Sequence, residues 1–233
     1  MNAVVTGSTK GIGKAIVELL ISKGINVAIC SRNEKEVDAF VAYLNESNNN
    51  ARAIGLRADM SDKEQVKAFA DFVLDEFETI DILVNNAGIF IPGEITQEED
   101  GALEKMIETN LYSAYHLTRA LVPNMLKNGS GHIFNMCSIA SQIAYPNGGS
   151  YSISKFALLG FSKVLREELK TKNIKVTSIL PGATWSNSWA GVELPESRLM
   201  QAEDIAKLVW SALEMSPSAV IEDIVIRPQL GDL

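Results

Sequence analysis

Cysteine and histidine are both scarce in this sequence of 233 residues, which contains two of each. Cys30 and Cys137 end apolar runs of strand-like composition, so we expect buried free thiols, which fits a reducing cytoplasm better than a disulfide framework does. His116 and His132 are too few and too far apart in the chain to bind zinc, so we expect no metal site. Any chemistry of this chain must rest on other residue types.

Positive charge is also in short supply, because 21 lysines and arginines face 29 aspartates and glutamates, for a net charge of −8. Without a basic run, a nucleic-acid surface is not expected. No apolar stretch approaches the ~20 residues that span a membrane, and the chain begins on strand-like sequence without a basic leader. We therefore expect a cytoplasmic protein, with the 46% apolar and 21% charged residues typical of a globular fold.

Apolar runs of strand length alternate with helical patterns along the whole chain. The runs lie at residues 3–6, 26–30, 52–57, 81–85, 131–137, 174–180 and 219–226. The helical patterns lie at residues 12–23, 33–46, 62–78, 97–127, 150–170 and 202–214. This alternation predicts an α/β fold, a Rossmann-type doubly wound parallel sheet with helices on both faces. No linker divides the chain, so we expect a single domain over residues 1–233.

A glycine-rich turn follows the first predicted strand, with the sequence Gly7-Ser8-Thr9-Lys10-Gly11-Ile12-Gly13. Glycines permit a tight turn and a close approach of the backbone to a phosphate, and the helix start that follows favours an anion. The spacing G-x-x-x-G-x-G differs from the general G-x-G-x-x-G fingerprint. The turn predicts a dinucleotide site, with an ordinary strand-to-helix turn as the alternative.

A tyrosine and a lysine four residues apart, Tyr151 and Lys155, lie on one face of a predicted helix, and Ser138 precedes Tyr151 by thirteen residues. A lysine ammonium beside a phenol stabilises the phenolate, so the tyrosine can exchange a proton near neutral pH. A serine hydroxyl nearby can bind the same substrate oxygen. These groups can protonate a carbonyl oxygen while a hydride arrives, and the hydride requires a cofactor because no side chain supplies one.

Six segments of the chain follow the order and spacing of one known family. They are TGSTKGIG at 6–13, NNAG at 85–88, Asn110, Ser138, Tyr151-Ser-Ile-Ser-Lys155 and Pro181-Gly182. From about residue 2 to residue 226, the chain resembles the short-chain dehydrogenase/reductases. The resemblance implies an oxidoreductase that interconverts a small-molecule carbonyl and an alcohol.

The resemblance also implies a role for each candidate residue. Tyr151 would be the general acid in reduction and the general base in oxidation, Lys155 would also bind the nicotinamide ribose, and Ser138 would polarise the substrate oxygen. Asn110 would interrupt helix 97–127 and hold a water of the proton relay. The alternatives are a plain serine-rich turn at Ser138 and an ordinary polar helix residue at Asn110.

Further cofactor contacts are implied by the same resemblance. They fall at Asp59, Met60, Asn86, Ala87, Gly88, Tyr151, Lys155, Pro181, Gly182 and Thr184. Because ligands of such sheets bind at the carboxyl ends of the strands, these positions should collect along one edge. Asp59 has an alternative role in the N-cap region of helix 62–78, for which Ser61 competes.

The choice between the two nicotinamide cofactors depends on the end of the second predicted strand. Ser31 and Arg32 stand there, where a carboxylate would favour NAD(H). Arg32 and Lys10 can pair with a 2′-phosphate, which favours NADP(H). NAD(H) remains the alternative if both cations are merely solvated.

The substrate cannot be specified further than a carbonyl/alcohol pair. A short lid near 183–200 carries Trp185 and Trp189, which either line the substrate site or pack the lid onto the body. The C-terminal sequence differs from that usual in 3-oxoacyl-carrier-protein reductases, which leaves that activity as an alternative. A non-catalytic cofactor sensor or scaffold is the alternative of a different class, and the resemblance implies a homodimer or homotetramer.

Overall fold

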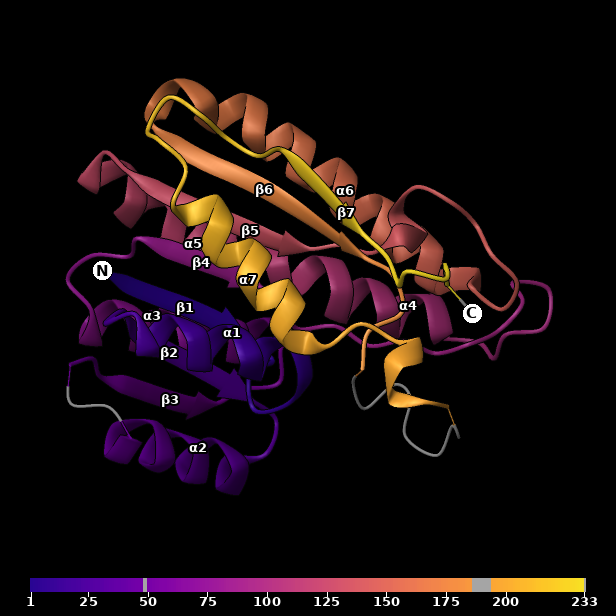
Figure 1. The fold of residues 1–233 in the computed structure, drawn as a ribbon, viewed down its shortest axis with the longest axis horizontal. Coiled ribbons are helices and arrows are strands. Elements are labelled where there is room, and N and C mark those ends of the chain that lie inside the picture. The colour runs from indigo at the N-terminus through magenta and orange to yellow at the C-terminus, as the bar shows by residue number, and fades with distance from the viewer. Residues whose placement is uncertain (48–49, 186–193, 233) are drawn as a thin grey trace.

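A seven-stranded parallel sheet forms the centre of the computed structural model, which describes residues 1–47, 50–185 and 194–232. Its strands are β1 (Asn2–Thr6), β2 (Asn26–Ser31), β3 (Ala53–Arg57), β4 (Ile82–Asn85), β5 (Gly131–Met136), β6 (Ile174–Pro181) and β7 (Asp223–Ile226). Their order is β3-β2-β1-β4-β5-β6-β7, and each neighbouring pair is parallel (Figure 1). The predicted doubly wound sheet is confirmed.

Helices connect successive strands. The α-helices are α1 (Gly11–Ser22), α2 (Glu34–Ser47), α3 (Lys63–Glu76), α4 (Ala102–Ile107), α5 (Ser113–Asn128), α6 (Gly149–Leu169) and α7 (Ala202–Leu213). A π-helical turn covers Glu108–Tyr112, and 3-10 turns cover Ile139–Ser141, Lys170–Lys172 and Glu196–Arg198. In the described part of the chain, no helix is both long and apolar enough to cross a membrane.

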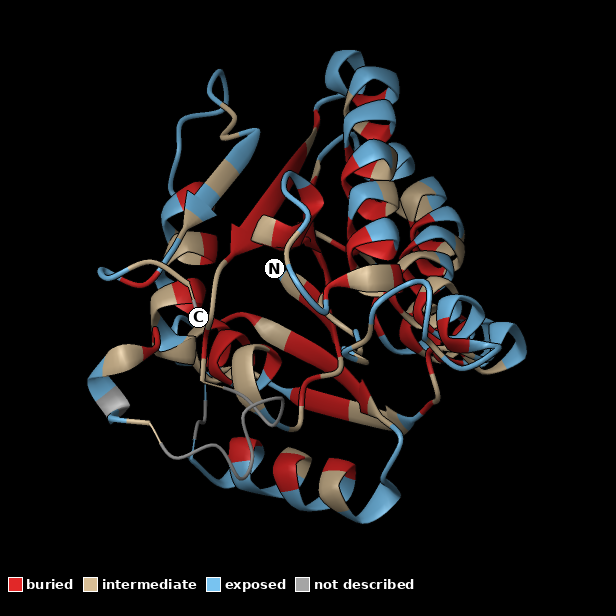
Figure 2. Cartoon of the chain, turned by 90° about the vertical axis from the view of Figure 1, so that its right-hand side faces the viewer, coloured by how far each residue is buried: buried red, intermediate tan, exposed pale blue. Residues whose placement is uncertain are grey.

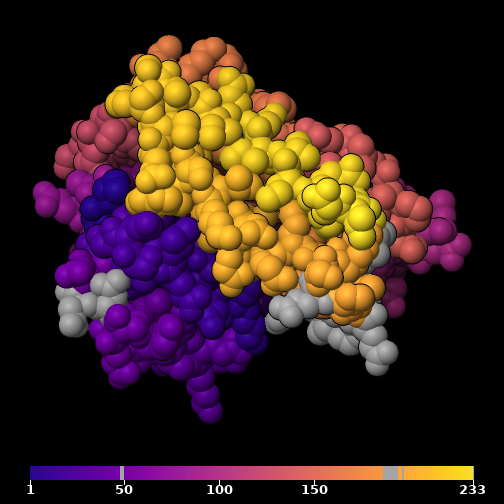
Figure 3. Space-filling model, in the orientation of Figure 1, coloured from indigo at the N-terminus to yellow at the C-terminus, as the bar shows by residue number. Residues whose placement is uncertain are grey.

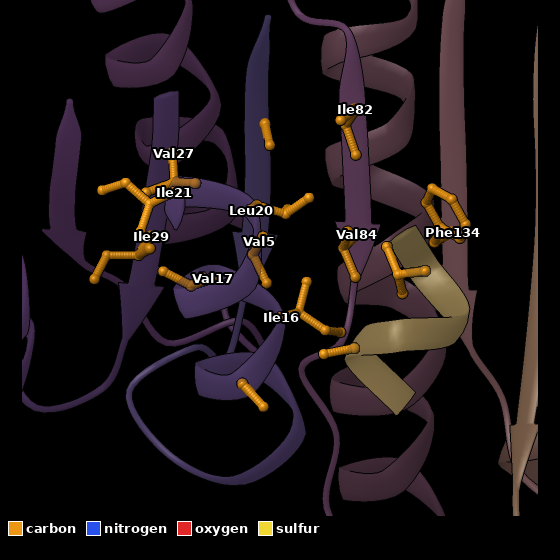
Figure 4. Packing of buried hydrophobic residues seen from close by; sticks show 14 of the residues in the cluster. Val5, Ile16, Val17, Leu20, Ile21, Val27, Ile29, Ile82, Val84 and Phe134 are labelled. Carbon is orange, nitrogen blue, oxygen red and sulfur yellow. The ribbon is translucent and has the colours of Figure 1, made fainter. Parts of the chain in front are cut away.

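Two apolar layers cover the sheet because successive side chains of a strand point to opposite faces. Val5 packs with α1, α2 and α7, whereas Val4 packs with α3, α5 and α6. Figure 4 shows the first layer, where Leu20 and Val17 of α1 lie against the strands. The central strands are buried on both faces and the helices are exposed on their outer sides (Figure 2), as a parallel sheet requires, whereas the edge strand β7 has no buried residue.

The two ends of the chain share one side of the molecule. Helix α7 packs against α1, and in Figure 3 the yellow C-terminal segments lie beside the indigo N-terminal third. The contact joins the first helix of the chain to the last one, which leads into the edge strand β7. All seven strands, from β1 to β7, belong to one sheet.

Two predicted elements had wrong boundaries. The helix predicted for 97–127 begins only at Ala102, after Gly101 in the left-handed region at φ +89°, and the π-helical turn interrupts it. The strand predicted for 219–226 shortens to β7, because strand pairing with β6 begins only at Asp223. The apolar sequence at 219–221 instead continues a turn in which the Ala219 N–H donates to the Ser216 carbonyl.

His132 lies inside the sheet rather than at its surface. It is 6% exposed, its ring stacks on Phe134, and its Nε2 lies 2.8 Å from the Thr177 hydroxyl oxygen. The Thr177 hydroxyl donates to the Ile221 carbonyl, so the imidazole is the donor in this pair. Burial, helped by Lys175, lowers the pKa of His132 to about 3.

Acid should therefore destabilise the fold through His132. The unfolded chain binds a proton at its ordinary pKa near 6.5 while the folded chain does not, so the free energy of unfolding falls as the pH drops below about 6.5. Between pH 7 and pH 5, this histidine should lower the free energy of unfolding by about 2 kcal/mol. Urea denaturation of the wild type and of His132→Gln at both pH values measures it. An equal loss in both proteins would contradict the assignment.

Candidate active site

The candidate site lies at the carboxyl edge of the sheet, where the strand order reverses between β1 and β4. The glycine-rich turn follows β1, the segment Asn86–Gly88 follows β4, and Ser138 comes shortly after β5. Parallel strands bring their carboxyl ends to the same edge, so the predicted segments meet there although they are far apart in sequence. This placement was predicted from the alternation of elements alone.

The glycine-rich turn has no room for a side chain at Gly13. A methyl group on Gly13 would lie 2.5 Å from both the Asn86 Nδ2 and the Gly7 carbonyl oxygen. Asn86 Nδ2 donates to the carbonyls of Thr6 and Gly7, at 2.9 and 3.0 Å. Gly7 and Gly11 have φ values of +62° and +54°, which glycine adopts readily. The turn is therefore fixed by β4 on one side and opens at the start of α1.

The first turn of α1 has no side-chain cap. Its N-cap residue, Lys10, has an extended backbone and accepts no hydrogen bond through its side chain. The backbone N–H groups of that turn and the positive end of the helix dipole suit a pyrophosphate. Ser8, predicted as a cofactor contact, faces inward: it is fully buried, its hydroxyl donates to the Val5 carbonyl, and its N–H donates to the Cys30 carbonyl.

The segment after β3 forms a second part of the edge. Asp59 is half-buried, and its carboxylate accepts from both the N–H and the hydroxyl of Ser61. The N-cap of α3 is Asp62, which accepts from the N–H groups of Glu64 and Gln65. The predicted competition between Asp59 and Ser61 for that cap was thus wrong. Met60 is buried, with its sulfur 3.6 Å from that of Cys30.

The end of β2 is charged and exposed. Arg32 is exposed, and Ser31 beside it is half-buried. Lys10 points its ammonium at Glu36 of α2, with 2.8 Å between Nζ and Oε1. Lys10 and Arg32, the two cations predicted to bind a 2′-phosphate, therefore differ in their surroundings, because Lys10 already has a carboxylate partner.

Asn110 is buried in the π-helical turn and binds two other segments of the edge. Its Oδ1 accepts from the Ile89 N–H at 2.7 Å, and its Nδ2 donates to the Ile89 carbonyl and to the Ser154 hydroxyl at 3.0 and 2.9 Å. It is 1% exposed. The π turn widens the helix where this amide leaves it, which such turns often do at functional sites. The predicted interruption of the helix at Asn110 is present.

Tyr151 and Lys155 lie on the same side of α6, one turn apart. The Lys155 ammonium is 5.7 Å from the centre of the Tyr151 ring and donates to the Met136 carbonyl at 2.8 Å. Phe90 packs on the Tyr151 ring in an edge-to-face arrangement, with 4.9 Å between the ring centres. The lysine is 5% exposed, so the ammonium is held between β5 and the phenol.

Ser138 caps the 3-10 turn that follows β5. Its hydroxyl oxygen accepts from the Ala140 N–H at 3.1 Å, and its own N–H donates to the Ser141 hydroxyl. Among the described residues the Ser138 hydroxyl donates no hydrogen bond, so its proton can reach a substrate oxygen. Burial raises the pKa of the neighbouring Cys137 thiol to about 11 and that of the Cys30 thiol to about 12, so both thiols are protonated at neutral pH. Both thiols are free, as predicted.

Glu98 is a residue of the site that sequence reasoning missed. Its carboxylate accepts from the N–H of Ser150 at 2.8 Å and also from the Ser150 hydroxyl, directly before Tyr151. A side chain on Gly149 would collide with it. The signal was an acidic residue in a loop that must cover the start of a helix without its own cap.

The C-terminal residues close over the segment after β6. The Asp232 carboxylate accepts from the Ala183 N–H at 2.8 Å and pairs with Arg227 at 2.6 Å. Arg198 donates to the carbonyls of Gly231 and Asp232. Thr184 is buried, and its hydroxyl donates to the Gly182 carbonyl. Of the two predicted lid tryptophans, Trp185 is half-buried and Trp189 lies outside the described residues.

A cavity of about 540 Å³ adjoins the start of α6. Its walls include Ile95, Tyr145, Pro146, Ile153 and Phe156. Burial, followed by the charges of Tyr151 and Asp232, raises the pKa of the Tyr145 phenol to about 12, so it stays protonated. The cavity is mostly apolar and lies beside the Tyr151 region, without including Tyr151 in its walls.

A family model described as short chain dehydrogenase matches residues 1–196. A 3-oxoacyl-acyl-carrier-protein reductase of Haemophilus influenzae is 36% identical over 217 residues, covering 89% of this chain and 88% of the relative.

Two solved structures match the whole sheet. An L-sorbose reductase of Gluconobacter frateurii, complexed with NADPH and L-sorbose, has a TM-score of 0.88 at 27% identity, covering 97% of this chain and 95% of that one. An alcohol dehydrogenase of Thermococcus sibiricus, complexed with 5-hydroxy-NADP, has a TM-score of 0.91 at 23% identity, covering 100% and 98%. The second likeness concerns the fold alone.

Removing the Glu98 carboxylate should loosen the start of α6. Glu98→Ala loses two hydrogen bonds to a charged acceptor, which should lower the free energy of unfolding by about 1–3 kcal/mol. Urea denaturation measures the loss, and amide exchange at Ser150 locates it. Glu99→Ala, at the exposed neighbouring position, is the matched control. Equal stability of the two variants would show that Glu98 does not hold the helix start.

Proposed function

This chain belongs to the short-chain dehydrogenase/reductase family, and we propose that it is an NADP(H)-dependent oxidoreductase that interconverts a carbonyl and an alcohol. The observation that carries the proposal is the position of the Lys155 ammonium, held by the Met136 carbonyl beside the Tyr151 ring, at the edge where Ser138 and Asn110 also lie. A protein that only binds a dinucleotide needs the glycine-rich turn but not this arrangement.

The residues fit a nicotinamide dinucleotide. The glycine-rich turn has no room for a side chain at Gly13, and the uncapped start of α1 offers N–H groups to a pyrophosphate. Asn86, Ala87 and Gly88 lie next to that turn, since the N–H groups of Asn86 and Ala87 donate to the Thr6 hydroxyl. When bound, the nicotinamide supplies or accepts the hydride.

The chain's own residues would move the proton. In reduction the Tyr151 phenol gives its proton to the carbonyl oxygen of the substrate, and in oxidation the phenolate takes a proton from the alcohol. Lys155 stabilises the phenolate by its charge, and the Ser138 hydroxyl donates to the same substrate oxygen. Asn110 positions Ser154 and the backbone at Ile89, and by the family resemblance it holds a relay water.

Preference for NADP(H) is part of the proposal. Arg32 is exposed at the end of β2, where a 2′-phosphate would lie, and no carboxylate occupies the end of that strand. The sorbose reductase was solved with NADPH. Pro181, Gly182 and Thr184 would border the nicotinamide.

We also propose a homo-oligomer in a reducing compartment such as the cytoplasm. Exposed apolar side chains lie on α5, α6 and the π-helical turn before α5, where a second copy would cover them: Tyr112, Tyr115, Ile153, Phe156 and Val164. The resemblance to the family's subunit contacts supports the same two helices.

Replacing the phenol separates catalysis from cofactor binding. Tyr151→Phe should lower kcat by about a hundredfold or more, because it removes the general acid, while the Kd for NADPH changes little. A steady-state assay of NADPH oxidation measures kcat, and fluorescence titration measures the Kd for NADPH. Tyr43→Phe, which removes an exposed phenol on α2, is the control. Undiminished turnover in Tyr151→Phe would refute the assigned role, and binding without turnover in the wild type would favour the sensor alternative.

The substrate class requires a panel. NADPH consumption against small ketones, aldehydes and a 3-oxoacyl thioester, with NADH in parallel, should show faster turnover of the small carbonyl compounds and a preference for NADPH. The relative from Haemophilus influenzae supports the alternative, a 3-oxoacyl-thioester reductase. Faster turnover of the thioester would establish that alternative, and a preference for NADH would contradict the role of Arg32.

A further inference from the structure

A carboxylate lies against the glycine-rich turn at the outer end of the candidate cofactor site. Glu36 Oε1 is 2.8 Å from Lys10 Nζ, and its Oε2 accepts from the Thr9 hydroxyl at 3.3 Å. The Asn33 side-chain amide donates to Oε1 at 3.1 Å. Glu36 is half-buried in the first turn of α2, so one carboxylate connects the glycine-rich turn with the residues that follow β2.

This is the part of the fold that distinguishes NAD(H) from NADP(H). In dinucleotide-binding sheets, an acidic residue roughly twenty positions beyond the glycine motif binds the 2′-hydroxyl of the adenosine ribose. The end of β2 has no carboxylate, but Glu36 stands 23 positions after Gly13. It comes from the next helix instead of from the strand, and its contacts with Thr9 and Lys10 bring it back to the turn.

The charges around it act in opposite directions on a 2′-phosphate. Arg32 is exposed, and among the described residues its guanidinium forms neither a hydrogen bond nor an ion pair, so it can attract a phosphate. Lys10 is already neutralised by Glu36, whose pKa the ammonium holds below its ordinary value, so the carboxylate is charged at neutral pH. A phosphate that approaches Lys10 must share it with this negative group.

We propose that Glu36 determines how strongly this protein discriminates between the two cofactors. Its carboxylate accepts from the ribose 2′-hydroxyl of NAD(H), and its charge and its hold on Lys10 weaken the binding of the 2′-phosphate of NADP(H). The inference rests on the proposed function and deepens it: Arg32 favours the phosphate, Glu36 opposes it, and the protein binds both cofactors.

Glu36→Gln tests the proposal because it keeps the size of the side chain and removes its charge. The Kd for NADPH should fall about threefold at low ionic strength, and the Kd for NADH should rise about threefold, so that the ratio of the two changes by about tenfold. The gain for NADPH should shrink as salt is added, because the charges are partly exposed. Fluorescence titration of the full-length protein with each cofactor measures both constants.

Glu34→Gln is the matched control. Glu34 is exposed in the same first turn of α2, and its replacement changes the net charge and the helix end equally without touching Lys10. Its ratio of dissociation constants should stay at the wild-type value. Equal shifts in Glu34→Gln and Glu36→Gln, or an unchanged ratio in Glu36→Gln, would overturn the role of Glu36.

Lys10→Met provides a second, independent variant. In the Lys10→Met protein, Glu36→Gln should improve NADPH binding less than it does in the wild type. The reason is that Lys10, which Glu36→Gln would free from its ion pair, has already been removed. An equal improvement in both backgrounds would overturn the part of the proposal that concerns Lys10. If the wild-type protein binds neither cofactor, the proposed function fails and this inference fails with it, whereas binding of both with an unchanged ratio refutes Glu36 alone.

Discussion

The buried side-chain amide of Asn110 connects two parts of the candidate site, the segment that leaves β4 and helix α6. Asn110 binds both backbone groups of Ile89, on the segment leaving β4, and also the Ser154 hydroxyl on α6. Ser154 lies directly before Lys155, so the amide fixes the position of this part of α6 relative to the end of β4. A buried amide without these partners would cost free energy, which makes the arrangement close to all-or-none. The π-helical turn is the backbone distortion that lets the amide reach both segments.

The sheet and the clustering of the site were predictable because they follow from strong, local signals. Seven apolar runs alternating with helices specify a parallel sheet, and such a sheet brings Thr6, Asn85 and Ser138 to one edge whatever the loops do. The predicted helix 97–127 failed in detail for two reasons. Gly101 adopts a left-handed backbone that delays the helix start, and the π turn accommodates the contacts of Asn110 with Ile89. The Glu98 contact with Ser150 joins residues 52 positions apart, and no periodicity encodes such a pair.

The same limit applies to the charges. Lys10 and Arg32 are both cations near the predicted phosphate, and sequence alone treats them as equal. The structure separates them, because α2 begins at a position that returns Glu36 to the glycine-rich turn. Ion pairs between exposed side chains contribute little to the stability of the fold, but they change the electrostatic attraction between the site and a charged ligand. Local pairing, not the count of cations, therefore decides what this end of the site attracts.

The two ends of the candidate site are built differently, and the difference bears on what each can recognise. At the dinucleotide end, backbone groups and tightly packed glycines fix the shape, so it has little freedom to change. At the substrate end, the segment after β6 is held by side chains of the C-terminal residues, with Asp232 accepting from Ala183 and Arg198 binding the last carbonyls. Asp232, Gly231 and Arg227 all belong to the last seven residues of the chain. Substrate selectivity in this chain should therefore depend on its last residues as much as on the loops around Tyr145.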